Sequence, residues 1–316
     1  MKMIRICVRS ALLVLAVLLA GAPAGSRADD PPPPLITAQW LQTHLNDQNV
    51  RVVEIGAGRA RLSYIQFMAG HIPGAAYTDY RADDWRTRDR NGVIDQLPSL
   101  AALERLVGGL GISNDDHVIL AAIGDDNYSV GAAARIYWTF KVIGHEKISI
   151  LDGGMTAYEA LEGALTETGR ANPEAASYTG HLNSDILIDR DAVRAALGGN
   201  GILVDYRSPG EYQGRHKILG TTKGGTIPGA VNIHEKGLLR GGGRFRPQSE
   251  LRAIYHDAGA YFDGLHIAFC TTGHRAALGW FVASELLGNK SARLYDGSMV
   301  DWVSDRSAPL AQPEPE

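Results

Sequence analysis

Two copies of one sequence pattern, about 150 residues apart, constrain the fold of this chain more than any other feature. Residues Gly70–Ala75 (GHIPGA) correspond to Gly225–Ala230 (GTIPGA), and LDGGM from Leu151 corresponds to YDGSM from Tyr295. Repeat units of solenoid proteins run to roughly 20–50 residues, so a period this long indicates duplication of a whole domain. We therefore expect two similar domains in tandem.

Within each copy, short apolar segments alternate with helical patterns, which predicts βαβ units and a parallel sheet. The fold class expected is α/β, with each domain a parallel sheet flanked by helices. In the first strand of each copy, Glu54 corresponds to Asp205. Residues 152–160 are expected to form a loop. Strands are expected at 50–56, 117–122, 147–151, 202–207 and 265–269, and helices at 38–47, 97–112, 132–144, 247–259 and 275–288.

The first 28 residues have the pattern of a signal peptide. Basic residues precede the apolar run ALLVLAVLLAGA, and small residues suited to cleavage follow it. An uncleaved anchor is the alternative, but the run is short for a bilayer span. We expect a periplasmic protein with no stable membrane insertion after cleavage, an N-terminal domain at 31–165 and a C-terminal domain at 176–312, joined by a polar, proline-containing linker.

Charge and cysteine content limit the chemistry further. The net charge is -4, which gives no sign of a nucleic-acid partner. Cys7 lies in the expected signal peptide, so the mature chain keeps Cys270 alone. In an oxidising compartment an unpaired thiol is either reactive or buried as a small hydrophobe.

The surroundings of Cys270 favour the reactive alternative. It follows an apolar strand and precedes a helix, and ligands of open α/β sheets bind at the carboxyl ends of strands. Amides of the loop and of the first helical turn favour an anion and would promote the thiolate. Gly273 suits a tightly curled loop, Arg275 could close that loop or counter an anionic substrate, and His274 could do the latter or face solvent.

The same position in the first copy has no nucleophile. The strand at 117–122 leads to Ile123 and to a loop that is acidic and is expected to be longer. The sequence therefore predicts one working site, in the second copy.

With these features together, the chain resembles tandem-domain rhodaneses, the thiosulfate/3-mercaptopyruvate sulfurtransferase family. The resemblance rests on the two GxIPGA turns, on VDYRSPGEY at 204–212, on CTTGHR at 270–275 and on YDGSMVDW at 295–302. It covers nearly the whole mature chain. It implies that 31–165 is a non-catalytic rhodanese-like domain, that 176–312 is catalytic, and that the catalytic cysteine lies at the interface between them.

What the resemblance implies for chemistry is a double displacement. The Cys270 thiolate takes sulfur from a small-molecule donor, and a thiophilic acceptor such as cyanide or a thiol then removes it. No metal or organic cofactor is expected, and a protein could also act as sulfur acceptor. The persulfide loop is expected to comprise Thr271, Thr272, Gly273, His274 and Arg275.

Four further residues are candidates around the donor. Arg207 and Lys223 are expected to bind substrate, and Asp205 and Glu211 to orient it. The alternatives are an ion pair of Arg207 with one of these carboxylates and an exposed surface position for Lys223. The segment 240–246 (RGGGRFR) could cradle an anion, but a mobile loop is favoured.

Other functions compete with thiosulfate sulfurtransfer. Cysteine phosphatases place five residues between cysteine and arginine, whereas this loop has four, and Phe269 precedes the cysteine where phosphatases carry histidine. Thr271 and Thr272 replace basic residues common in thiosulfate-preferring relatives, and Thr226 replaces a histidine of the family turn. Mercaptopyruvate as donor, a persulfide carrier with little turnover, and a vestigial site therefore stay open.

Overall fold

The computed structural model describes residues 32–58, 60–171, 173–199, 201–260 and 264–314. Residues 32–316 form one compact unit. The expected signal peptide at 1–28, with Cys7, lies outside the described residues.

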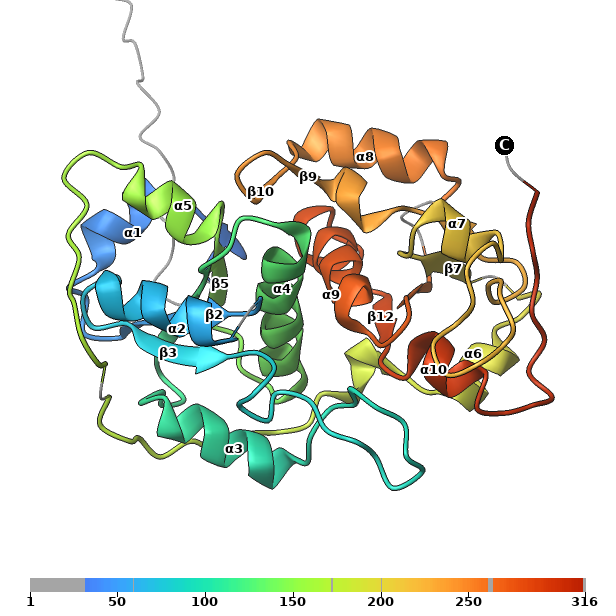
Figure 1. Cartoon of the computed structure of the whole chain (residues 1–316), viewed down its shortest axis with the longest axis horizontal. Coiled ribbons are helices and arrows are strands. Elements are labelled where there is room, and N and C mark those ends of the chain that lie inside the picture. Colours follow the sequence, from blue (N-terminus) through green and yellow to red (C-terminus); the bar gives the residue numbers. More distant parts are fainter. Residues whose placement is uncertain (1–31, 59, 172, 200, 261–263, 315–316) are drawn as a thin grey trace, which may run out of the picture. The chain divides into compact units, whose positions relative to one another are not determined.

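The first half of the unit is built on a parallel five-stranded sheet in the order β1-β5-β4-β2-β3 (Figure 1). Its central strand, β4, is buried at every position. The strands are β1 (Leu35–Ile36), β2 (Val50–Gly56), β3 (Ala76–Asp79), β4 (His117–Ala122) and β5 (Ile148–Leu151). The helices are α1 (Ala38–His44), α2 (Ala60–Ala69), α3 (Leu100–Gly109), α4 (Asn127–Val142) and α5 (Gly154–Glu159).

The second half repeats this sheet in the order β6-β12-β11-β7-β8, again parallel. Its strands are β6 (Leu187–Ile188), β7 (Ile202–Asp205), β8 (Val231–Asn232), β11 (His266–Phe269) and β12 (Ala292–Tyr295). A separate antiparallel hairpin pairs β9 (Leu239–Arg240) with β10 (Arg244–Phe245). The α-helices are α6 (Arg190–Ala195), α7 (Pro209–Tyr212), α8 (Gln248–Asp257), α9 (His274–Phe281) and α10 (Ser298–Trp302). Shorter turns are 3-10 helices at Ser184–Ile186 and Glu235–Leu238 and a π-helical turn at Val282–Leu286.

The two sheets correspond strand by strand, which confirms the expected α/β fold of two parallel sheets flanked by helices. Three local predictions are wrong. Residues 152–160 include the helix α5, because Gly153 and Gly154 adopt left-handed backbone angles that let a helical turn start there. The β9–β10 hairpin at 239–245 takes up most of the segment 240–246, where the sequence favours a mobile loop. The β4–α4 and β11–α9 loops have four residues each, so the first-copy loop is not longer.

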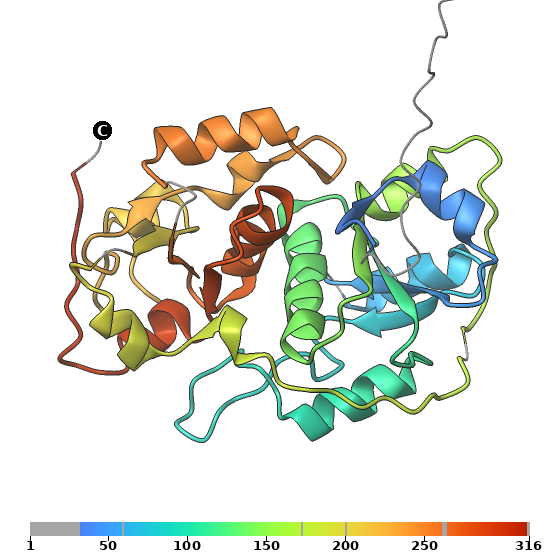
Figure 2. The same ribbon diagram turned by 180° about the vertical axis from the view of Figure 1, so that it is seen from behind.

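Helices α4 and α9 pack against each other and join the two halves, as both views show (Figures 1 and 2). Nearly every residue of α4 is buried, because it has its own sheet on one side and α9 on the other. Tyr137 of α4 meets Phe281 of α9 edge to face, with ring centroids 4.8 Å apart. A single hydrophobic cluster therefore runs through residues of both halves.

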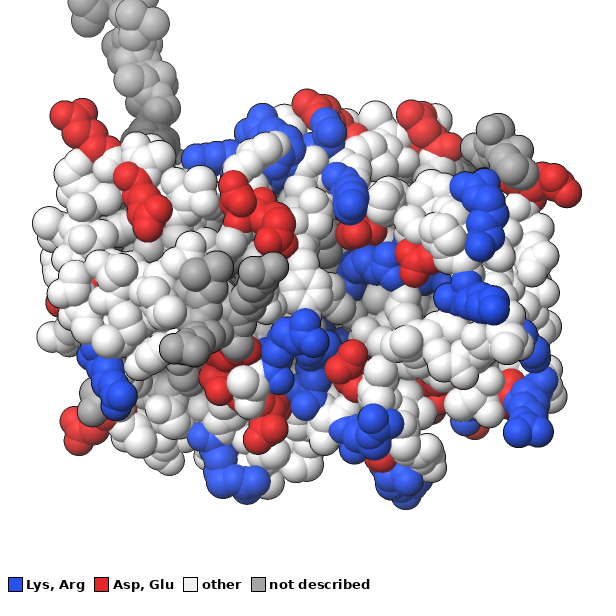
Figure 3. All heavy atoms as spheres, in the orientation of Figure 1, with Lys and Arg blue, Asp and Glu red and all other residues white. Residues whose placement is uncertain are grey.

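On the face shown in Figure 3, acidic and basic side chains are interspersed, so neither charge dominates that face. Among the described residues, none of the helices is both long and apolar enough to cross a membrane, and no cluster of histidine, cysteine or acidic residues is arranged to hold a metal ion.

Candidate active site

Cys270 immediately follows β11, the central strand of the second sheet. Its side chain is buried, with the residue 1% exposed, and it is a free thiol. Helix α9 begins four residues later, at His274. The first amides of a helix have no acceptor within it, so the loop presents N–H groups near the sulfur. This places the thiol at the carboxyl end of a central parallel strand, where open α/β sheets bind ligands.

Ser298 fixes the inner side of the loop. Its Oγ accepts hydrogen bonds from the amides of Cys270 and Gly273, each at 3.1 Å, and donates to the Tyr295 carbonyl at 2.8 Å. Ser298 has φ +49°, a left-handed conformation that is uncommon for a residue with a side chain. The sequence analysis missed this residue, although it lies in the YDGSM segment that repeats LDGGM.

Backbone amides of α10 donate hydrogen bonds to two carbonyls of the cysteine loop. The amide of Met299 donates to the Cys270 carbonyl and that of Val300 to the Thr271 carbonyl, both at 3.1 Å. These two carbonyls therefore accept from α10, while Ser298 accepts from the Cys270 and Gly273 amides.

Arg275 closes the loop through Glu211. Its two terminal nitrogens each donate to one oxygen of Glu211 at 2.8 Å, and Nη2 also donates to Thr271 Oγ1 at 2.7 Å. Glu211 accepts from the hydroxyl of Ser208 as well, at 2.8 Å. Burial alone would raise the pKa of Glu211, but its hydrogen bonds and the charge of Arg275 lower that pKa to about 2. Glu211 thus holds the Arg275 guanidinium in place.

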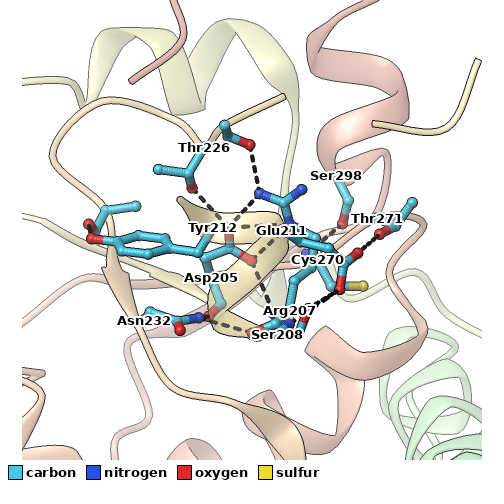
Figure 4. A network of polar contacts seen from close by, with 12 residues as sticks. Asp205, Arg207, Ser208, Glu211, Tyr212, Thr226, Asn232, Cys270, Thr271 and Ser298 are labelled. Carbon is cyan, nitrogen blue, oxygen red and sulfur yellow. Dashed lines mark hydrogen bonds and ion pairs between the residues drawn. The ribbon is translucent and has the colours of Figure 1, made fainter. Parts of the chain in front are cut away.

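Arg207 and Asp205 form a buried ion pair beside this loop (Figure 4). Arg207 donates from Nε and Nη2 to the Asp205 carboxylate and from Nη2 to the Gly225 carbonyl at 2.8 Å. Thr226 Oγ1 donates to the same carboxylate at 2.7 Å. The structure therefore favours the alternative role for Arg207, an ion pair that ties β7 to the GTIPGA turn, over the predicted contact with substrate.

Three other residues predicted for the site, Lys223, Thr272 and Thr271, differ in their distance from it and in their contacts. Lys223 is exposed on a loop that lines a cavity of about 540 Å³ with Arg215 and Lys217, and no contact of the described residues joins its side chain to the cysteine loop. Thr272 is half-buried. The Thr271 hydroxyl, in contrast, joins Arg275 to Glu211.

His274 faces the first half of the chain, so the predictions of a solvent-facing or substrate-facing side chain are wrong. It is buried, its Nδ1 lies 2.9 Å from the Tyr80 hydroxyl, and its ring stacks on Tyr128 with centroids 4.4 Å apart. Burial, followed by the charges of nearby arginines, lowers the pKa of His274 to about 3. The ring is therefore neutral near pH 7 and supplies no cation.

Arg135, which sequence reasoning also missed, brings a cation from the first half. It lies on α4, is 1% exposed, and its Nη2 is 2.5 Å from Asp296 Oδ1. Among the described residues, its Nε and Nη1 have no hydrogen-bond partner. Nη1 lies 2.3 Å from where a Cβ on Gly273 would stand. Burial opposes the charge, but Asp296, Tyr80 and Cys270 together raise the pKa of Arg135 above its ordinary value.

A signal for Arg135 was present in the sequence. It is the only charged residue in the apolar stretch VGAAARIYWTF at 130–140, which overlaps the helix predicted at 132–144. A buried arginine is costly unless it is paired, so such a residue indicates a partner and a role.

Comparisons with known proteins agree with this geometry. The family model of the rhodanese-like domain matches residues 37–161 and again 189–305. The chain is 32% identical over 293 residues to the sulfur carrier protein TtuD of Thermus thermophilus, covering 90% of this chain and 98% of that protein. It is 32% identical over 289 residues to a Saccharopolyspora erythraea protein named "Putative thiosulfate sulfurtransferase", covering 89% and 96%.

Solved structures give the same fold. The crystal structure of SseA from Escherichia coli, described as a 3-mercaptopyruvate sulfotransferase, has a TM-score of 0.70 and 25% identity, covering 84% of this chain and 99% of that one. An anaerobic ergothioneine biosynthesis enzyme from Chlorobium limicola has a TM-score of 0.76 at 20% identity, covering 89% and 71%, and shares the fold.

Two parallel sheets and one buried cysteine loop define a tandem-domain sulfurtransferase. The chain belongs to the rhodanese family, with two rhodanese-like domains in tandem.

Proposed function

We propose that this sulfurtransferase uses thiosulfate as donor and Cys270 as the sulfur carrier. The Cys270 thiolate attacks the outer sulfur of thiosulfate, the sulfur–sulfur bond of the donor breaks, and sulfite leaves with the bonding electron pair. An acceptor, cyanide or a thiol, then attacks the terminal sulfur of the persulfide and regenerates the thiolate. The position of Cys270 between β11 and the first amides of α9 carries this proposal.

Two kinds of group stabilise the charge in this scheme. The amides of Thr271, Thr272 and the first turn of α9 act as preorganised donors to an anionic sulfur, the type of contribution that is usually large in catalysis. Arg275 and Arg135 add two cations whose pKa values are raised in part by the charge of Cys270. Burial makes these interactions stronger than they would be in water.

The identity of the sulfur donor is a separate part of the proposal. Two buried or half-buried cations near Cys270 suit a divalent anion such as thiosulfate, and a relative carries that donor in its name. The alternative is 3-mercaptopyruvate, favoured by the small residues Thr271 and Thr272 and by the likeness to SseA. A persulfide carrier with little turnover is a third role, favoured by the likeness to a sulfur carrier protein.

Steady-state assays test the proposal. We expect the protein to form thiocyanate from thiosulfate and cyanide, faster than it transfers sulfur from mercaptopyruvate, and we expect Cys270→Ser to abolish both reactions. Mass spectrometry after thiosulfate alone should show the mass of one added sulfur on wild type and none on Cys270→Ser. A persulfide without turnover would support the carrier, and turnover that survives the substitution would exclude the mechanism.

The proposal includes the place of the reaction. We propose cleavage of the segment 1–28, export to the periplasm, and division of the chain into a non-catalytic domain at 31–165 and a catalytic domain at 176–312. Cell fractionation with N-terminal sequencing of the mature protein tests this part. Recovery of the full-length chain from the cytoplasm would contradict it.

A further inference from the structure

Glu54 and Asp205 are corresponding buried carboxylates in the two copies, but they have different partners. Asp205 accepts a hydrogen bond from Thr226 of the GTIPGA turn, and Glu54, its counterpart, accepts one from the Ile72 amide of the GHIPGA turn at 2.7 Å. Each carboxylate thus ties its strand to the same turn. In the second copy, Arg207 also neutralises the charge of Asp205.

At the position of Arg207 the first copy has no arginine. Two residues after Glu54 comes Gly56, where the second copy has Arg207. A Cβ on Gly56 would stand 2.3 Å from the Tyr77 hydroxyl, so the position has no room for a side chain. Glu54 is 1% exposed, and its Oε2 has no hydrogen-bond partner among the described residues. A buried carboxyl oxygen without a partner costs folding free energy, which a bound donor would recover.

Glu54 lines a cavity of about 560 Å³ at the carboxyl end of the first sheet. Asp125 and Glu159 line it too, and among the described residues that line it there is no lysine or arginine. Ile123, the counterpart of Cys270, and Phe67 contribute apolar surface. The volume suits a ligand of several heavy atoms, and the charges repel anions such as a sulfur donor.

We propose that this cavity of the non-catalytic domain binds a small organic cation, a guanidinium or alkylammonium compound, whose charged group donates to Glu54. The bound ligand supplies the positive charge that Arg207 supplies in the other copy, and its alkyl part packs on Phe67 and Ile123. This site is separate from the cysteine loop and does not depend on the identity of the sulfur donor.

Protonation of Glu54 should be linked to binding. Burial, then the charge of Glu159, raises the pKa of Glu54 to about 8, although the bond from the Ile72 amide opposes the rise. Among the described residues, the other ionisable groups facing the cavity are Asp125 and, through its interaction with Glu54, Tyr158 of α5. The empty site therefore holds a proton near pH 7 and releases it when a cation binds, so affinity should rise with pH.

Calorimetry with two matched probes tests the proposal on the full chain. n-Butylguanidinium carries the charge, and n-butylurea is its neutral counterpart of the same shape. We expect the cation to bind at one site at least tenfold more tightly than the urea at pH 8, and at least tenfold more weakly at pH 6 than at pH 8. Equal binding of the two probes would overturn the proposal.

Variants locate the site. Glu54→Gln should keep the bond to the Ile72 amide and lose the preference for the cation, whereas Cys270→Ser should bind as wild type does. Should Glu54→Gln fail to fold, Ile123→Trp fills the cavity and should weaken cation binding at least tenfold. Wild-type affinity in Glu54→Gln, or in Ile123→Trp, excludes this cavity as the site.

Discussion

The hydroxyl of Tyr80, in the first half of the chain, lies 2.9 Å from Nδ1 of His274, the first residue of α9 after the Cys270 loop. Two further contacts cross between the halves at the same place, from Arg135 and from the Leu97 amide, both to Asp296. The first half therefore contributes directly to the shape and charge of the cysteine loop.

Replacing Tyr80 with Phe should lower stability with little effect on donor binding. The change leaves a buried imidazole nitrogen without its partner, which costs about 1–2 kcal/mol of unfolding free energy. His274 is neutral at working pH, since its pKa is about 3, so the KM for the donor should not change. Urea unfolding and steady-state kinetics measure the two effects. Tyr128→Phe, which keeps the stacked ring, is the control and should change stability by less than about 0.5 kcal/mol.

Gly273→Ala should be among the most destabilising single changes in the loop. Gly273 has φ +79°, and an added Cβ would lie 2.3 Å from Arg135 Nη1 and 2.9 Å from the Asp296 carbonyl oxygen. Strain and overlap together should cost about 2–4 kcal/mol. Gly241→Ala has nothing within 4 Å and no positive φ, so thermal unfolding should find it close to wild type. Equal melting temperatures for the two variants would show that the loop relaxes freely.

The sheets could be predicted from sequence because their central strands are short apolar runs with distinct ends. The predicted range 50–56 is the strand β2, and 117–122 is β4. The short helix α7 and the hairpin at 239–245 could not, because a few residues carry too little periodicity to reveal them. Cys270 was predicted to be the nucleophile from its place between a strand and a helix, and the structure places it there.

The partners of the site residues depend on packing that sequence does not encode locally. His274 was expected at the surface because loop histidines usually are, but α4 and Tyr80 cover it. Arg135 reaches Asp296 across 161 positions of the chain, and only the packing of the two halves brings them together. Arg207 lies two residues after Asp205, so the sequence could not decide whether Arg207 binds substrate or pairs with a nearby carboxylate.

Glu54→Gln should stabilise the protein in a pH-dependent way. Glu54 has a folded pKa of about 8, above its unfolded value of 4.5, so the folded state holds a proton that the unfolded state releases between these values. Wild-type stability should therefore fall as pH rises from about 4.5 to 8, and this loss should be absent in the glutamine variant. We expect the two proteins to be equal near pH 4.5 and the variant to be more stable by about 2 kcal/mol at pH 8, allowing for solvent in the cavity. Urea unfolding measures both proteins at both pH values. The same difference in unfolding free energy at pH 4.5 and at pH 8 would contradict the raised pKa.

Arg135→Met should reduce the reactivity of Cys270 from the other half of the molecule. The change removes a buried cation beside the loop, so the thiolate loses electrostatic stabilisation, and alkylation of Cys270 by iodoacetamide at pH 6.5 should slow about tenfold. Arg135→Lys keeps a charge and should recover part of the rate, while Arg105→Met, an exposed arginine of α3, should leave it unchanged.

Stability is separated from reactivity by a second substitution. Arg135→Met alone leaves the Asp296 carboxylate unpaired, which should destabilise the fold by about 3 kcal/mol. Adding Asp296→Asn removes that unpaired charge and should restore much of the stability without restoring the alkylation rate, because the missing cation is still missing. If the double variant recovers both, Arg135 acts only as a structural partner of Asp296, and the charge it brings to the cysteine loop has no part in sulfur transfer.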